Sequence, residues 1–227
     1  MSSASLYKQI YKANIHKISS GNIGIDPYLS DHTVDSRRGI SLIIPVLGIK
    51  EEYAALVGQF QALAPEQYYY PLEDLHTTVF DFIRASDQYT RNEKQEKEFR
   101  LITHVALGNV PRFSLRLNGI VFSSAAGLLK GYDDDRLIVI RQNIRHLMAA
   151  RGLRNDERYE SSSAHVTFCR FPSPLLDPAP FVSLLEARKY LYLGTEKVSR
   201  MELVEHDWYN SNGTKRIIAS FDLGSGE

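Results

Sequence analysis

A short pattern occurs twice in this sequence, 89 residues apart, and it constrains the fold more than any other feature. In each copy an apolar residue precedes a histidine, which is followed by any residue, a threonine and a second apolar residue. The two copies are Leu75-His76-Thr77-Thr78-Val79 and Ala164-His165-Val166-Thr167-Phe168. The other five histidines lack Ser or Thr two positions later. Both copies lie in apolar stretches of strand character, so we expect two related strands, one in each half of the chain.

The alternation of side chains along a strand explains why this pattern matters. Residues i and i+2 of a strand point to the same face, so His76 projects together with Thr78, and His165 with Thr167. The residues between them face the other way, into the core. If the two strands lie side by side or across a cleft, two imidazoles and two hydroxyls converge on one point.

Two imidazoles and two hydroxyls are suited to the chemistry of a phosphodiester. The unperturbed pKa of histidine, near 6.5, lets one ring take a proton from water while the other gives one to the leaving oxygen. The hydroxyls of Thr78 and Thr167 can donate to the non-bridging phosphate oxygens. This scheme needs neither metal nor cofactor. The single cysteine, Cys169, also excludes an intrachain disulfide and a cysteine-rich zinc site.

The rest of the chain alternates helix and strand signals, which predicts a mixed α and β protein. Apolar spacing predicts helices at 5–18, 51–63, 91–107, 134–150 and 180–190. Strands are predicted at 39–47, 75–83, 113–122, 128–132, 165–171, 201–208 and 215–223. Asn212-Gly213 is typical of a hairpin between the last two strands. The similar order of elements in the two halves indicates antiparallel neighbours and an internal structural duplication.

The composition limits the classes of function. The chain has 27 Lys and Arg against 27 Asp and Glu, so its formal net charge is zero. A protein that coats nucleic acid is normally basic, so we expect any RNA partner to be short or held locally. The chain has neither a secretory apolar segment near its start nor a membrane-length apolar run. We therefore expect a cytoplasmic protein without a membrane segment, and a monomer.

The paired H-x-T motifs resemble those of the two-histidine (2H) phosphoesterase superfamily, which includes 2′-5′ RNA ligase-like proteins and 2′,3′-cyclic nucleotide phosphodiesterases. The resemblance covers about residues 39–223. It implies a bilobal α+β fold with two antiparallel sheets around a central cleft, helices outside and a pseudo-two-fold duplication. On this basis we divide the chain into an N-terminal extension, residues 1–38, and a single bilobal domain, residues 39–227.

The resemblance also implies roles for single residues. His76 would be the general acid on the leaving oxygen and His165 the general base on water, with Thr78 and Thr167 binding the phosphate. Arg170 follows His165 by five residues, as in the H-x-T-x-x-R form of the RNA-ligase-like branch, and is a candidate substrate contact. The first motif has Asp81 at the corresponding position. Tyr70 is a further candidate, because an aromatic ring at a cleft mouth can stack on a base.

The activity implied by the resemblance is metal-independent hydrolysis of a 2′,3′-cyclic phosphate, on a nucleotide or an RNA 3′ end, to a phosphomonoester. One alternative is a phosphodiesterase that uses the same histidines on 3′,5′- or 2′,5′-linked nucleotides or cyclic oligonucleotides. The other is a nucleotide- or RNA-binding module without catalysis. The intact histidine and threonine in both motifs argue against the binding module, which needs no proton-transfer groups.

A group of arginines near the second motif has two interpretations. They can form a solvated helix face paired with neighbouring carboxylates, or a local patch for an RNA backbone. The group comprises Arg141, Arg145, Arg151, Arg154 and Arg158.

Overall fold

The computed structural model describes residues 3–29, 35–154, 156–157 and 160–224 of the chain. Within these residues the α-helices are α1 (Ser3–Ser19), α2 (Lys50–Leu63), α3 (Glu93–Leu107), α4 (Arg136–Ala150) and α5 (Pro178–Arg188). Two short 3₁₀ turns are η1 (Pro27–Leu29) and η3 (Leu72–Asp74). The strands are β1 (Arg38–Pro45), β2 (Tyr68–Tyr69), β3 (His76–Ser86), β4 (Phe113–Phe122), β5 (Ala126–Tyr132), β6 (Val166–Arg170), β7 (Tyr192–Val198), β8 (Arg200–His206) and β9 (Arg216–Asp222).

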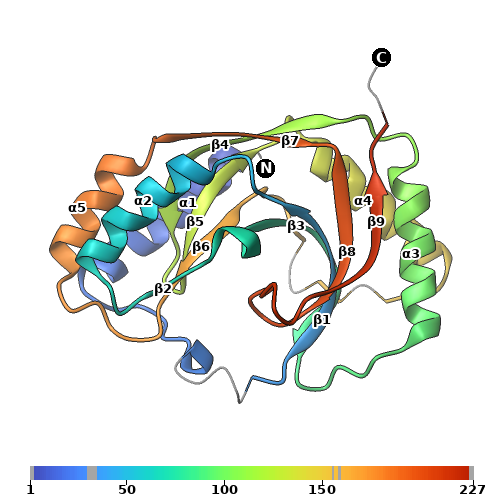
Figure 1. Ribbon diagram of the computed structural model, residues 1–227, viewed down its shortest axis with the longest axis horizontal. Coiled ribbons are helices and arrows are strands. Elements are labelled where there is room, and N and C mark those ends of the chain that lie inside the picture. Colours follow the sequence, from blue (N-terminus) through green and yellow to red (C-terminus); the bar gives the residue numbers. More distant parts are fainter. Residues whose placement is uncertain (1–2, 30–34, 155, 158–159, 225–227) are drawn as a thin grey trace.

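One curled antiparallel sheet forms the frame of the molecule (Figure 1). Its strand order is β7-β4-β5-β6-β3-β1-β8-β9, and β2 pairs with β6 outside this path. The order divides into two four-stranded halves, β7-β4-β5-β6 and β3-β1-β8-β9, whose facing edges are the two motif strands. Within the described residues the ladder between these edges consists of one pair, Thr77 with Val166. The two expected sheets are thus present as halves that meet at the motifs.

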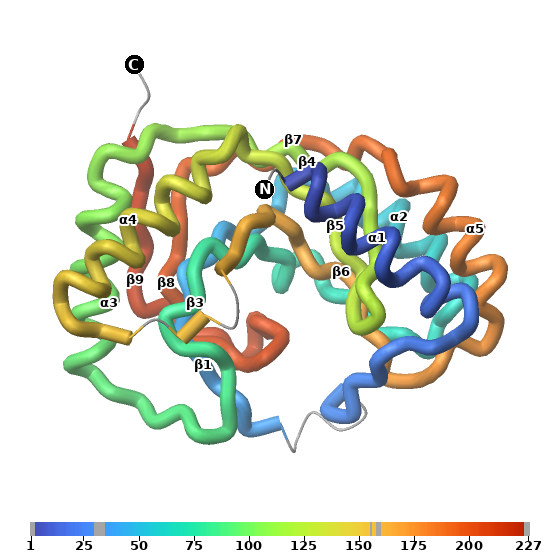
Figure 2. Tube along the Cα trace, turned by 180° about the vertical axis from the view of Figure 1, so that it is seen from behind, coloured from blue at the N-terminus to red at the C-terminus, as the bar shows by residue number. Residues whose placement is uncertain are grey.

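The helices cover the two halves separately (Figures 1 and 2). Helices α3 and α4 pack against each other beside the β3-β1-β8-β9 half, where α3 contacts β9 and α4 contacts β3. Helices α1, α2 and α5 lie with the other half, where α1 and α5 both contact β4. Among the described residues no helix is both long enough and apolar enough to cross a membrane.

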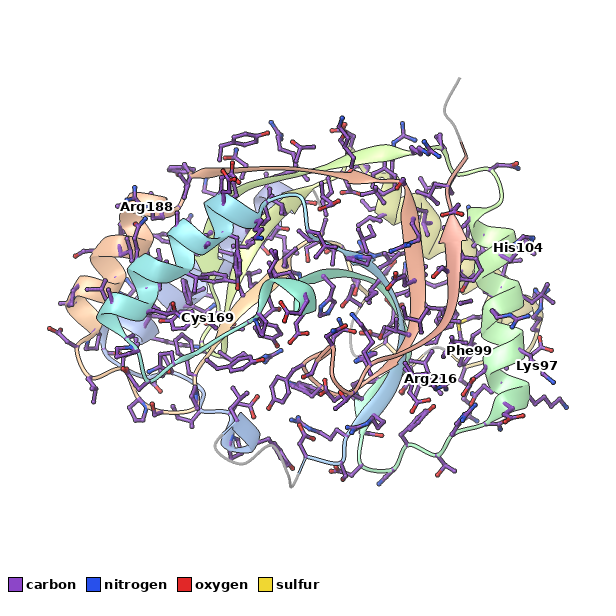
Figure 3. All side chains as sticks on the ribbon, in the orientation of Figure 1. Lys97, Phe99, His104, Cys169, Arg188 and Arg216 are labelled. Carbon is purple, nitrogen blue, oxygen red and sulfur yellow. The ribbon has the colours of Figure 1, made fainter. Side chains whose placement is uncertain are left out.

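Aromatic side chains fill the core of both halves. In one half Phe60 of α2 lies 5.0 Å, between ring centroids, from Phe181 of α5 and 5.8 Å from Phe168 of β6. In the other half Phe99, on α3 (Figure 3), stacks on Phe82 of β3 with centroids 4.6 Å apart. Each motif strand is therefore anchored by phenylalanines behind the face that carries its histidine.

A β-bulge in β3 changes which residues share a face. The register with β1 shifts between the pairs Ile43–Thr78 and Leu42–Phe80, which leaves Val79 as the extra residue. Val79 and Phe80 are both buried. The residue after them, Asp81, returns to the face of Thr78 and is only partly buried. This single insertion brings an acidic side chain onto the motif face.

The predicted α+β class, the pseudo-two-fold order and the predicted helices and strands are all confirmed, with ends that differ by a few residues. The sequence analysis missed β7, because this edge strand is mostly polar and only partly buried and contains Gly194. The expected N-terminal helix is present as α1. Its Tyr7 hydroxyl accepts from the Gly131 amide and donates to the Gly131 carbonyl, both at 3.1 Å. Residues 30–34 of the expected extension and the end of the expected domain, 225–227, lie outside the described residues.

Candidate active site

The two motifs lie side by side in the middle of the sheet. Thr77 of β3 is paired with Val166 of β6 in antiparallel register, and both side chains are fully buried. In an antiparallel pair, the residue before one partner lies across from the residue after the other. His76 therefore lies across from Thr167, and the other histidine across from the other threonine. Both histidines and both threonines are partly exposed on the face opposite to the buried pair.

This register places the two histidines at opposite corners of a four-residue patch. Diagonal neighbours across an antiparallel pair have side chains that start roughly 7–8 Å apart. A tetrahedral phosphate can fill that separation and meet one imidazole on each side. Neither Thr78 nor Thr167 has a side-chain hydrogen bond to another described residue, so both hydroxyls are available to a ligand. The structure thus brings together all four residues that the sequence pattern singled out.

The imidazole of His76 is held by the backbone just before it. Nδ1 lies 2.8 Å from the carbonyl oxygen of Asp74, which only accepts hydrogen bonds, so Nδ1 carries the hydrogen. The other ring nitrogen, Nε2, is left to face the site, with a lone pair when the ring is neutral and a hydrogen when it is charged. The side-chain nitrogen of Asn210, itself a donor, lies 3.2 Å from Nδ1 and contacts the ring without a hydrogen bond to it. The adjacent backbone therefore orients this ring by a hydrogen bond, and a second segment, distant in sequence, contacts it.

The loop between β8 and β9 is the more distant of these segments (Figure 1). The carboxylate of Asp207 organises the loop by accepting hydrogen bonds from the amides of Tyr209 and Ser211 and from the hydroxyl of Thr214. The amide of Asn212 then donates to Asp74 at 2.6 Å. Sequence analysis assigned this stretch only as a hairpin turn, since nothing local in it indicates contact with His76.

The imidazole of His165 has a different neighbour. Its Nδ1 lies 2.7 Å from the hydroxyl of Ser163, which can donate or accept. This hydrogen bond is compatible with either neutral tautomer and with the charged ring. His165 can therefore gain or lose a proton at Nε2 without losing its partner.

Arg141 of α4 forms hydrogen bonds to the backbone of both motif segments. Its side chain is 1 % exposed, and its guanidinium donates to the carbonyls of Val79 at 2.8 Å, Thr78 at 3.1 Å and Ser163 at 2.7 Å. Both interpretations of Arg141 as a surface arginine, on a solvated face or in an RNA patch, are therefore wrong. The helical spacing was correct, but it did not show that this position faces the sheet.

Arg145, Arg151 and Arg154 of that group lie near the surface. Arg145 forms ion pairs with Glu157 and Glu160, and Arg151 lies 3.7 Å from Glu98. Arg158 lies outside the described residues. The paired arginines fit the interpretation as a solvated face better than the interpretation as a free cationic patch.

Electrostatics keep both histidines neutral at neutral pH. Burial lowers the pKa of His76 to about 4; the hydrogen bond to Asp74 opposes this, while nearby His206 and Lys215 add to it. Burial also lowers the pKa of His165 to about 4, and the positive charges of Arg141 and Arg170 act in the same direction. A ligand anion between the rings would raise the pKa of both histidines and so favour a proton on one of them.

Arg170 and Tyr70, the two further candidate contacts, form a pair. Arg170 Nε donates to the Tyr70 hydroxyl at 2.8 Å, and its guanidinium carbon lies 5.8 Å from the ring centroids of Trp208 and Tyr209. Tyr70 is only 3 % exposed, so its ring has no free face for a nucleobase. The expectation that Tyr70 stacks on a base is therefore corrected, and its position makes it a support for Arg170.

His206 belongs to the same half of the sheet as His76, and the repeated sequence pattern did not single it out. It lies at the end of β8, and its Nε2 is 2.7 Å from the hydroxyl of Ser41 on β1. Ser41 in turn donates to Asp81 at 2.6 Å. Among the described residues, no group of three or more His, Cys, Asp or Glu side chains is arranged to hold a metal ion.

Comparison with solved structures assigns the fold. TT0787 of Thermus thermophilus aligns with a TM-score of 0.57 at 16% identity, covering 84% of this chain and 100% of that one. E. coli LigT complexed with 3′-AMP aligns with a TM-score of 0.51 at 17% identity, covering 83% and 98%. A protein of unknown function from Agrobacterium tumefaciens, ATU0111, aligns with a TM-score of 0.54 at 15% identity, covering 91% and 99%. No family model and no curated protein matches the sequence.

Proposed function

We propose that this chain, which has the fold of LigT-like two-histidine phosphoesterases, is a metal-independent phosphodiesterase that opens 2′,3′-cyclic phosphates on nucleotides or RNA 3′ ends. The observation that carries the proposal is the register Thr77–Val166, which places His76 and His165 at opposite corners of one patch with a threonine beside each. An acid and a base on opposite sides of a phosphate are what in-line hydrolysis requires.

The reaction follows from these positions. His165 Nε2 takes a proton from water as the water oxygen bonds to phosphorus, and His76 Nε2 gives its proton to the leaving ribose oxygen as the P–O bond breaks. The hydroxyls of Thr78 and Thr167 donate to the non-bridging oxygens, whose charge grows in the transition state. The product is a phosphomonoester. After turnover His165 holds the proton, and exchange with solvent restores the starting state.

His76 takes up the proton it needs from solvent when the substrate binds. In the empty site both rings are neutral near pH 7, because their pKa values lie near 4. A phosphodiester carries one negative charge, which stabilises one imidazolium beside it. The pair therefore takes up one proton as substrate binds, and this couples binding to activation.

A small or locally held substrate agrees with the neutral chain. Arg170 follows the second motif on β6 and offers its remaining guanidinium hydrogens to a phosphate or a base edge. E. coli LigT, which shares the fold, was crystallised with 3′-AMP, a ribonucleotide. We include a cytoplasmic setting in the proposal, in which the thiol of the buried Cys169 stays reduced.

The test is hydrolysis of the four nucleoside 2′,3′-cyclic monophosphates in EDTA. Wild type would be compared with His76→Ala and His165→Ala, and with His146→Ala, an exposed histidine on α4, as matched control. We expect both motif variants to lose activity and the control to keep it. The product isomer then identifies the leaving oxygen and so the acid.

Other outcomes of this assay would favour a different function. Turnover only of 3′,5′- or 2′,5′-linked substrates, lost in the same variants, would favour the alternative phosphodiesterase. Tight nucleotide binding by a folded wild type with no turnover of any of these substrates would favour the binding module. Activity retained in both His76→Ala and His165→Ala would overturn the two-histidine mechanism.

A further inference from the structure

Asn210 of the β8–β9 loop is a buried polar residue that touches His76. It is 2 % exposed, and its Oδ1 receives no hydrogen bond from any of the described residues. Its Nδ2 lies 3.2 Å from His76 Nδ1, which carries a hydrogen because it faces the carbonyl of Asp74. Two donors therefore face each other, while the acceptor of the same carboxamide is left without a donor.

A half turn of the carboxamide about its Cβ–Cγ bond changes both of these contacts. The turn exchanges Oδ1 with Nδ2 and needs almost the same space, because the two atoms are nearly equal in size. Oδ1 of Asn210 then accepts from His76 Nδ1–H, and the contact between two donors is removed. The carbonyl of Asp74 stays at its 2.8 Å, so two acceptors share one hydrogen.

The loop holds Asn210 in place from both sides. Asp207 accepts hydrogen bonds from the two backbone amides that flank Asn210, and the amide of Asn212 donates to the carboxylate of Asp74 at 2.6 Å. Asn210 itself has a φ of 57°, in the left-handed region that Asn, Asp and Gly adopt more readily than other residues. The same loop thus holds the carboxamide beside His76 and contacts the residue whose carbonyl holds the ring.

The two motif histidines differ in what faces Nδ1. His76 Nδ1 faces a carbonyl, which can only accept, and the carboxamide of Asn210. His165 Nδ1 faces the hydroxyl of Ser163 at 2.7 Å, which can donate as well as accept. A charged imidazole carries hydrogen on both nitrogens, so acceptors at Nδ1 stabilise the charged ring. Two acceptors at one ring against one hydroxyl at the other favour a proton on His76.

Neighbouring charges do not supply this preference. Burial has the largest effect on the pKa of His76 and lowers it, and the hydrogen bond to the backbone of Asp74 opposes burial. The titratable side chains that act most on the ring are His206 of β8, Lys215 of the β8–β9 loop and His165, and each lowers the pKa of His76. A preference for the proton on this ring must therefore come from the acceptors at its Nδ1.

We propose that Asn210 is a positioning residue for His76: its Oδ1 accepts from Nδ1–H beside the carbonyl of Asp74, and this second acceptor places the proton taken up on substrate binding on His76 instead of His165. The second part rests on the function proposed above and deepens it, because it names what makes His76 the acid. The first part concerns the empty protein, so it can be measured without a substrate.

The test of the first part is an NMR titration of the histidine ring signals in the full chain without ligand. Asn210→Gly removes the carboxamide and suits the left-handed backbone. We expect it to lower the titration midpoint of His76 by about half a pH unit, although water entering the vacated space would raise that midpoint. Asn210→Asp keeps an acceptor and adds a charge, and should raise the midpoint by about one pH unit. Asn212→Asp, which adds the same charge at an exposed position of the loop, is the matched control and should raise it much less.

Two results of this titration would overturn the proposal. One is a His76 midpoint that is unchanged or higher in Asn210→Gly, since loss of an acceptor can only lower it. The other is an equal rise in Asn210→Asp and Asn212→Asp, which would show that position 210 has no special access to the ring.

Hydrolysis of 2′,3′-cyclic nucleotides by the same variants tests the second part. In Asn210→Gly we expect kcat to fall about tenfold with little change in KM, and the high-pH limb of kcat to move to lower pH. Asn210→Asp should recover most of kcat and move that limb to higher pH. Equal kcat profiles in Asn210→Gly and wild type would overturn the second part. Failure of wild type to hydrolyse any phosphodiester would leave the titrations valid and would count only against the proposed function.

Discussion

Thr77 and Val166 face each other across the joint between β3 and β6, and this one backbone pair determines how the two motifs combine. Because the pair is antiparallel, each histidine lies beside the threonine of the other motif, and the two histidines share a diagonal. A parallel pair would have placed histidine beside histidine and threonine beside threonine. The antiparallel joint is therefore what leaves room for a phosphate between the two rings.

Removal of the threonine hydroxyls should slow the reaction without disturbing the fold. We expect Thr78→Val and Thr167→Val each to lower kcat by on the order of 10², because each loses one donor to the charge that develops on phosphate. Valine keeps the shape and the strand preference of threonine. Steady-state kinetics beside Thr90→Val, an exposed loop threonine, would check this. Equal kcat in all three variants would exclude a role for these hydroxyls in the transition state.

The pH dependence of the rate should differ between kcat/KM and kcat. In the free enzyme both histidines have pKa values near 4, so the form with one proton on the pair is most abundant near that pH. kcat/KM should therefore follow a bell centred in the acid range. A bound anion raises the pKa values, so the optimum of kcat should lie at higher pH. Profiles of the two parameters would test this, and a single rising limb in both would contradict the scheme.

The same pKa values predict how stability changes with pH. A histidine whose pKa is about 4 in the folded protein and about 6.5 when unfolded binds more protons in the unfolded state between these values. Its contribution is complete above pH 6.5 and is lost as the pH falls toward 4. Each ring contributes a slope of at most about 1.4 kcal/mol per pH unit, reduced by the water that reaches it.

Urea unfolding of His76→Gln and His165→Gln from pH 7 to pH 4.5 would measure these slopes. Glutamine does not titrate, so each variant should lose less stability than wild type over this range. His146→Gln, on the exposed side of α4, should behave like wild type. A variant curve parallel to that of wild type would show that the ring concerned titrates normally in the folded protein.

Arg141→Met should be strongly destabilising. The buried guanidinium donates to the carbonyls of Thr78, Val79 and Ser163, and methionine removes all three of these hydrogen bonds. An unsatisfied buried polar group costs about 1–3 kcal/mol, so we expect a loss of about 3 kcal/mol or more. Arg100→Met, on the exposed side of α3, should change the free energy of unfolding by less than about 0.5 kcal/mol. Comparable urea midpoints for the two variants would show that Arg141 does not brace the motifs.

Arg170 and Tyr70 should affect substrate binding. We expect Arg170→Met to raise KM for a cyclic nucleotide by roughly tenfold with little change in kcat, as befits a contact equally strong in ground and transition states. Tyr70→Phe removes only the hydrogen bond that orients the guanidinium, so its effect on KM should be smaller and in the same direction. A drop in kcat at unchanged KM in Arg170→Met would assign this arginine to the transition state instead.

The parts of this structure that were predictable are those with a local periodic signal. The motif strands, the helix 134–150 and the final hairpin follow from alternation, from helical spacing and from Asn212-Gly213. The strand period alone predicted that His76 and Thr78 share a face. It also indicated that the two motifs belong to matching halves.

The remaining features depend on contacts between segments far apart in the chain. Arg141 lies on a helix with two other arginines, and only the docking of α4 on β3 shows that it is buried. The bulge that turns Asp81 toward Ser41 has no local signal, because valine and phenylalanine continue a strand equally well. Asn210 reaches His76 only because β8 is placed beside β1.

The placement of β8 beside β1 also determines when the site can form as the chain is synthesised. β1 and β3 are synthesised early, but β8 and β9 follow only after residues 113–198, which contain the strands β4, β5, β6 and β7 of the other half, have been made. Until then β1 lacks its second partner, and His76 lacks Asn210 and the loop that holds Asp74. The nascent chain thus carries both histidines long before it can use them. The time at which activity appears, on the ribosome or during refolding, would therefore measure when the β8–β9 hairpin pairs with β1.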